Sequence, residues 1–205
     1  MIINDKKYKL TENNFIPIET MKSQIVLANT LNSDMGHFKG WTKRYNGKYL
    51  KTAAFTIDSA GLVYKHFDPK YHSKYFGELE HDTKSIVILL ENNGWLTKNT
   101  EKNEFNNWLG GIYNKDKKIF KKKWRGYEYW ACYNDKQVES AANLVKILCD
   151  EYFIPLSVMT HNTKVDSEAL ESIVYKSNIN KHYKDLNPSW DCLKFKNKIE
   201  NERKH

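Results

Sequence analysis

The feature that most constrains the fold of this chain is a segment from Ser85 to Glu91, Ser-Ile-Val-Ile-Leu-Leu-Glu, whose five inner residues are all apolar. Apolar residues that do not alternate with polar ones are typical of a strand covered on both faces of its sheet. A second, shorter run at Ile25–Leu27 predicts another buried strand. We therefore expect a central sheet with helices packed against both of its faces.

A hairpin and a first helix are predicted around these strands. Residues 53–57 and 62–67 are separated by a turn in which Gly61 is placed to take a positive φ. Residues 32–34, Asn-Ser-Asp, are expected to cap a helix that carries His37 and Trp41.

The second half of the chain predicts a long helix, a short strand and a final helix. Asp135 is expected to cap a helix that runs to about Tyr152 and buries a face of Val, Ala and Leu residues. Residues 156–160 are interpreted as a strand that ends at His161, residues 166–172 as a helical turn, and residues 190–199 as the last helix.

These elements predict one α/β domain with a single mixed central sheet flanked by helices. The chain has 205 residues and is 40% hydrophobic, which is enough for one sizeable core. We assign residues 1–21 to an N-terminal arm, residues 22–200 to the domain and residues 201–205 to a tail. Residues 92–135 are rich in aromatic side chains and are interpreted as an insertion within the domain.

The charge balance favours an anionic partner or a lysine-rich solvated surface. Lys and Arg number 33 against 25 Asp and Glu, so the formal net charge is +8. The densest cluster lies at residues 115–123. Because no nucleic-acid motif of the usual kinds is present, nucleic acid is not the expected partner.

The sequence contains few signals that indicate a cellular compartment. The three cysteines are widely spaced and form no disulfide framework, so reduced thiols are expected. The N-terminal residues contain no apolar signal core, and no run is long enough to span a bilayer. The sequence thus predicts a protein that is cytoplasmic at synthesis and needs separate delivery to act outside the cell.

The order of the motifs resembles one known family. Residues 55–69 read F-x-I-x-x-x-G-x-V-Y-x-x-F-D-P, residues 85–92 read S-I-x-I-x-L-E-N, and residues 185–191 read D-x-x-P-x-W-D. The insertion contains G-W-L and W-R-G-Y-x-Y-W. Over about residues 22–199 this series resembles the type 2 N-acetylmuramoyl-L-alanine amidases, which include phage lysozyme-like amidases and are related to peptidoglycan-recognition proteins.

The resemblance implies a zinc site made of two histidines and one Asp or Cys. By position, His161 matches the second histidine and Asp185 matches the acidic ligand. Ala28 falls where the first histidine belongs, and its methyl group cannot donate to a metal. If residues 162–184 do not hold an insertion, Lys176 matches the second histidine instead, and Asp185 alone remains. The alternative is that His161 has no role in metal binding and is a histidine at the end of a strand whose ring hydrogen-bonds to the backbone.

Further roles are implied by the same resemblance. Leu89 occupies the position of the family's catalytic Glu, so Glu91 is the candidate acid or base from a shifted place, and Lys184 is the candidate oxyanion partner. His37 or His66 are possible substitutes for the missing ligand. The predicted substrate-binding residues are Asn29, Trp41, His72 and Trp95.

Two functions follow from the resemblance. The first is a peptidoglycan hydrolase, such as a phage lysin, that cleaves the muramoyl–L-alanine amide bond with zinc-activated water. The second is a degenerate relative that uses no zinc and binds peptidoglycan fragments or another anionic ligand, because three protein ligands are usual for catalytic zinc. Charge and aromatic content alone motivate a weaker third function, nucleic-acid association.

Overall fold

The fold is built on a six-stranded mixed sheet. The computed structural model of the chain describes residues 1–114, 117–163, 168–169 and 171–200. The strand order is β1-β4-β3-β5-β2-β10, and every neighbouring pair is parallel except β3 with β4. The strands are β1 (Ile3–Asn4), β2 (Gln24–Asn29), β3 (Phe55–Ile57), β4 (Val63–Lys65), β5 (Ser85–Leu90) and β10 (Ile173–Tyr175). The predicted α/β class with a mixed central sheet is confirmed.

The two apolar runs lie at the centre of this sheet. β5 pairs in parallel with β2 over six residues and with β3 on its other side, and every residue of β2 and β5 is buried. Burying one Val, Leu or Ile side chain contributes about 1.5–3 kcal/mol, so these strands anchor the core.

The hairpin is confirmed, and the first residues of the chain join it. β3 and β4 are antiparallel, and Gly61 in their turn has a φ of 84°. β1 adds to the outer edge of β4. Leu10 and Phe15 are buried in the main core. They precede and follow the 3₁₀ helix η1 (Glu12–Asn14). Residues 1–21 therefore pack onto the domain.

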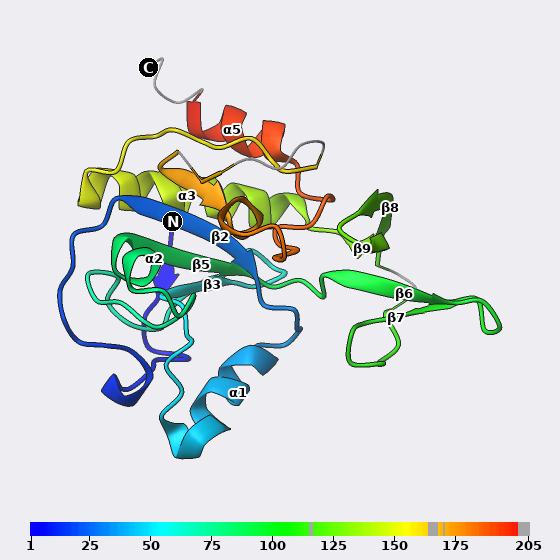
Figure 1. Ribbon diagram of the computed structural model, residues 1–205, viewed down its shortest axis with the longest axis horizontal. Helices are drawn as coiled ribbons and strands as arrows, with labels where there is room; N and C mark the ends of the chain where they lie inside the picture. The colour runs from blue at the N-terminus through cyan, green and yellow to red at the C-terminus, as the bar shows by residue number, and fades with distance from the viewer. Residues whose placement is uncertain (115–116, 164–167, 170, 201–205) are drawn as a thin grey trace.

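Helices cover both faces of the sheet. In Figure 1, α3 (Asp135–Tyr152) and α5 (Cys192–Glu200) lie on one side, and α1 (Gly36–Lys43), followed by the 3₁₀ helix η2 (Arg44–Gly47), lies on the other. No helix of the described residues is long and apolar enough to cross a membrane.

Both predicted helix caps are wrong in detail. α3 is capped by Asn134 in place of Asp135, because the Asn134 side chain accepts from the backbone of Gln137 and the Gln137 side chain accepts from the backbone of Asn134. α1 begins after Met35, which has a left-handed φ of 53°, and no side chain caps it. The backbone N–H of Met35 donates to Glu91 Oε1 at 3.1 Å.

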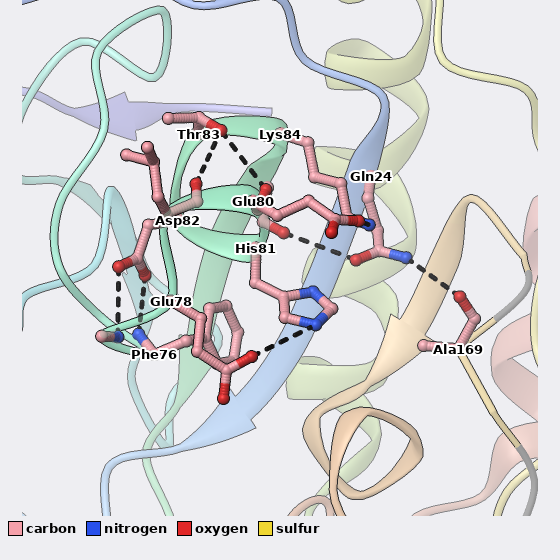
Figure 2. Close-up of polar contacts among 12 residues, drawn as sticks. Gln24, Phe76, Glu78, Glu80, His81, Asp82, Thr83, Lys84 and Ala169 are labelled. Atoms are coloured by element: carbon pink, nitrogen blue, oxygen red, sulfur yellow. Dashed lines mark hydrogen bonds and ion pairs between the residues drawn. The ribbon is translucent and has the colours of Figure 1, made fainter.

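The short helix α2 (Leu79–Lys84) is held by its own polar side chains. The Asp82 carboxylate accepts from the backbone N–H groups of Phe76 at 2.7 Å and Gly77 at 3.1 Å. Figure 2 shows Asp82 turned toward Phe76. The Glu80–Lys84 pair at 2.8 Å spans one helical turn. The Asp82 contacts fix the loop that precedes α2, and α2 leads directly into β5.

The aromatic-rich insertion forms a second sheet of its own. Its strand order is β7-β6-β9-β8, and all pairs are antiparallel. In Figure 1 this sheet extends away from the central sheet. The strands are β6 (Trp95–Asn99), β7 (Glu104–Asn106), β8 (Ile119–Trp124) and β9 (Tyr127–Ala131).

The strand that pairs with the outer side of β2 was not predicted from the sequence. Residues 156–160 make only an isolated bridge, Val158 with Ile173, whereas β10 pairs with β2 in register Tyr175 with Leu27. The sequence interpretation missed β10 because its apolar part is only three residues long. Of the helical turn predicted at residues 166–172, positions 166, 167 and 170 lie outside the described residues, and the described residues 168–169 and 171–172 are not helical. β10 leads directly into α4 (Lys176–Ile179), which places Lys176 at the carboxyl end of the sheet.

Candidate functional site

Asp185 lies at the carboxyl end of β2. Its Oδ2 atom accepts from the backbone N–H of Asn29 at 3.1 Å, and its side chain is buried. Asn29 directly follows Ala28, which is fully buried. The acidic residue and the missing-ligand position therefore converge at one edge of the sheet.

Lys176 is the cation of this edge. Its Nζ atom lies 3.8 Å from Asp185 Oδ2 and 3.3 Å from the Tyr75 hydroxyl. Burial by itself lowers the pKa of Lys176, but the Asp185 carboxylate and Tyr75 together raise it above its ordinary value. Burial also raises the pKa of Tyr75 to about 12. At neutral pH the site therefore holds a charged ammonium beside a neutral phenol.

The His161 side chain contacts a backbone carbonyl and aromatic rings. Its Nε2 atom lies 2.9 Å from the Leu186 carbonyl, and its ring packs against Trp124 and Tyr175. Burial lowers the pKa of His161 to about 4, so the ring is neutral and Nε2 carries the proton. The Nδ1 atom is buried and has no hydrogen-bond partner among the described residues. His161 thus meets the backbone beside Asp185, and its ring joins β10 to the second sheet.

The two candidate substitutes, His37 and His66, are both bound to Thr56. His66 Nδ1 lies 2.7 Å from the Tyr8 carbonyl and therefore carries a proton, so His66 Nε2 accepts from the Thr56 hydroxyl at 2.8 Å. His37 Nε2 then donates to the same Thr56 oxygen at 3.0 Å. Burial lowers the pKa of His37 to about 3 and that of His66 to about 4. These contacts tie both rings to the core beneath α1.

The Glu91 carboxylate holds two loops together. Its Oε1 and Oε2 atoms accept from the backbone N–H groups of Met35 and Ser59 at 3.1 and 2.9 Å. It also lines a pocket of about 230 Å³ together with Tyr133, Gln137 and residues of the insertion. Lys176 and Asp185 do not line this pocket. The pocket and the Lys176–Asp185 pair are therefore separate features.

Asn29 belongs to a polar network that fixes the loop after Asp185. The Tyr133 hydroxyl donates to Asn29 Oδ1 and accepts from the Asn187 backbone at 3.4 Å. Asn187 Nδ2 donates to Asn92 Oδ1 at 3.1 Å. This network, which the sequence interpretation missed apart from Asn29, connects β2, β5 and β9 to the predicted acidic ligand.

The structure brings Lys184 and Trp95 together. The Trp95 and Tyr127 rings stack with centroids 4.9 Å apart, and Lys184 Nζ lies 5.7 and 5.6 Å from them. All three residues are half-buried. We call Trp95, Tyr127 and Lys184 the aromatic–cation group. Since Lys184 precedes Asp185 in sequence, this group adjoins the Lys176–Asp185 pair.

The other predicted substrate contacts are buried. Trp41 is 5% exposed and packs edge-on against His37 and His66. His72 is 6% exposed and pairs with Ile16 in an isolated antiparallel bridge. Both positions favour packing, whereas Trp95 presents part of its ring to the surface.

Arg125 fastens the second sheet to the loop that leads to Asp185. Its guanidinium donates to the carbonyls of Ser177 at 3.1 Å, Asn180 at 3.2 Å and Tyr183. Neighbouring Trp124 donates from Nε1 to the Asn162 carbonyl. The W-R-G motif therefore positions residues 177–183, a role that its sequence alone did not indicate.

Replacing Arg125 with Ala is expected to lower the free energy of unfolding by about 2 kcal/mol, because three carbonyls lose a charged donor. Amide hydrogen exchange across residues 177–183 should accelerate. Lys123→Ala, an exposed change on the same hairpin, is the matched control. Unchanged exchange in Arg125→Ala would show that the loop is held by other contacts.

The residues present do not fit a catalytic zinc ion. Within the described ranges there is no group of three or more His, Cys, Asp and Glu side chains that could hold a metal. Asp185 contacts the ammonium of Lys176, and Ala28 supplies no donor atom. Catalytic zinc normally requires three protein ligands. Among the described residues, this edge therefore lacks the three protein ligands of a catalytic zinc site.

Comparisons with known proteins agree with the fold. A family model described as N-acetylmuramoyl-L-alanine amidase matches residues 20–169. The catalytic domain of XlyA is 17% identical with a TM-score of 0.56, covering 97% of this chain and 99% of that one. LysC from Clostridium intestinale is 12% identical with a TM-score of 0.53, covering 97% of both chains.

A third solved structure carries a ligand. The E. coli amidase AmiD, in complex with anhydro-N-acetylmuramic acid-L-Ala-D-gamma-Glu-L-Lys, is 13% identical with a TM-score of 0.58. The match covers 89% of this chain and 59% of that one. No curated protein matches the sequence. At these identities the structural matches establish the shared fold, and the family match covers most of the chain.

Proposed function

Because the chain belongs to the N-acetylmuramoyl-L-alanine amidase family, we propose that its ligand is peptidoglycan and that it binds the muropeptide at the carboxyl edge of β2 and β10. The observation that carries the proposal is the position of Asp185, which lies at this edge within a family-matching fold. The family relation supports a peptidoglycan amidase function. The side chains at this edge indicate whether the chain hydrolyses the muropeptide or only binds it.

The chemistry of the edge suits a muropeptide. A muropeptide offers a sugar ring, amide carbonyls and carboxylates. The aromatic–cation group offers stacked rings and an ammonium, and aromatic faces and cations are common partners of such groups. Lys176 adds a second ammonium next to Asp185. The net charge of +8 favours approach to an anionic wall polymer.

These side chains best support a protein that binds peptidoglycan without zinc. Sedimentation with purified peptidoglycan sacculi tests it. We expect the chain to co-sediment, and Trp95→Ala and Lys184→Ala to weaken binding about tenfold, or about 1.4 kcal/mol. Phe153→Ala is the matched control, since this aromatic side chain is 93% exposed at the far end of α3. Absence of co-sedimentation by the unmodified chain would reject the proposal.

Hydrolysis of the muramoyl–L-alanine amide is the second candidate, and the family match favours it. It would make the chain a wall hydrolase, such as a phage lysin. The decisive assay measures new L-alanine amino termini released from sacculi, with and without a chelator. Chelator-sensitive release would establish the zinc hydrolase. Binding without release would establish a protein that binds peptidoglycan and does not hydrolyse it.

A further inference from the structure

Two strand ends meet where the family resemblance implies a metal. β2 brings Ala28 to this edge, and β10 brings Lys176, which follows the Tyr175 that pairs with Leu27. Lys176, the first residue after β10, therefore continues this register to the position next to Ala28. The structure thus favours the alignment in which Lys176, and not His161, matches the second histidine.

The side-chain directions agree with this alignment. Tyr175 donates from its hydroxyl to Cys192 Sγ at 3.0 Å and packs against His161, on the side of α5. Lys176 instead contacts Tyr75 and the Asp185 carboxylate. Consecutive residues at the end of a strand point to opposite faces. His161 and Lys176 therefore lie on different sides of β10, and the carboxylate is on the lysine side.

The Lys176 ammonium is enclosed but keeps donor capacity. The Tyr75 and Tyr183 rings flank it with centroids 4.7 and 4.5 Å away. An ammonium has three N–H donors. Among the described residues its contacts are one hydrogen bond, to Tyr75, and the ion pair with Asp185 at 3.8 Å. Its side chain is 18% exposed, so a ligand atom can reach it.

We propose that Lys176 is the resident cation of this site: its ammonium takes the place of the metal ion and donates to a carbonyl or carboxylate oxygen of the bound muropeptide. This inference rests on the proposed function for its ligand. The claim that the site binds no metal ion does not depend on that function. A fixed positive charge beside Asp185 repels a divalent cation, and the methyl group of Ala28 offers that cation no donor atom.

The first test needs no variant. The purified chain is analysed for bound metal, and its melting temperature is measured with added zinc and with a chelator. We expect far less than one zinc ion per chain and the same melting temperature in both conditions. Stoichiometric zinc whose removal lowers the melting temperature would overturn the inference.

The second test measures affinity for a soluble muropeptide in the presence of chelator. Lys176→Met is expected to weaken binding about tenfold, and Lys176→Arg, which keeps the charge, to weaken it less. Lys181→Met, an exposed change nearby, is the matched control. Full affinity in Lys176→Met would overturn the role of the ammonium. A folded state is confirmed for each variant by circular dichroism.

A third test separates this inference from the proposed function. The double variant Ala28→His, Lys176→His supplies two imidazoles beside Asp185, and zinc should raise its melting temperature. If the unmodified chain binds no muropeptide, the proposed function fails, yet the metal analysis still decides the cation claim. If the double variant does not fold, the metal content of the unmodified chain and the affinity of Lys176→Met for the muropeptide still test the inference.

Discussion

Replacing Lys176 with Met is expected to lower the free energy of unfolding by about 2–3 kcal/mol. The change leaves the Asp185 carboxylate, which is 8% exposed, without its cation. Breaking a fully buried pair costs about 3–5 kcal/mol, and the 18% exposure of Lys176 reduces that figure through solvent screening. Urea denaturation followed by circular dichroism measures the effect.

A double-mutant cycle identifies the pair as the cause. Asp185→Asn should also destabilise, because the ammonium then loses its charge partner. The double variant Lys176→Met, Asp185→Asn should be more stable than the sum of the single effects predicts, because neither charge is left alone. Additive effects within about 0.5 kcal/mol would mean that the two side chains do not interact.

Acidification below about pH 6.5 is expected to destabilise the protein through His37 and His66. Burial holds the pKa of these residues near 3 and near 4 in the folded chain, below the ordinary value of 6.5. In the unfolded chain both protonate as the pH falls through 6.5, so the unfolded state binds more protons. Their contribution is complete above pH 6.5 and is lost progressively toward pH 4 for His66 and pH 3 for His37, at up to about 1.4 kcal/mol per pH unit for each imidazole.

Urea denaturation at a series of pH values checks this expectation. His66→Gln retains a donor and an acceptor for the Tyr8 carbonyl and Thr56 but cannot titrate, so the slope between pH 6.5 and 4 should become shallower. His182→Gln changes an exposed imidazole and serves as the control. An identical slope in His66→Gln would exclude His66 as a source of the acid sensitivity.

Local signals in the sequence were sufficient for the inner strands of the main sheet. The unbroken apolar run at residues 85–91 predicted the central strand β5, and Gly61 predicted the turn between β3 and β4. The helix cap was misplaced by one residue because Asn134 and Asp135 are both good capping residues, and only the reciprocal bonds with Gln137 distinguish them.

The candidate site was harder to predict because its key strand is short. Residues 156–160 have a stronger strand pattern than residues 173–175, yet β10 takes the edge beside β2. Three apolar residues carry little periodic signal, and the pairing that selects them is long-range. The roles of Tyr75, Tyr183 and Arg125 likewise depend on loops that meet only after folding.

The sequence by itself determined the α/β class, the order of the central strands along the chain, the absence of a donor at Ala28 and the acidic residue Asp185. Only the tertiary structure decided which residue stands next to Ala28, and it places Lys176 there, paired with Asp185. The physical reason is that apolar patterning is local and reports burial. The neighbour of a strand end is fixed by strand pairing between residues distant in sequence, which local patterns do not encode.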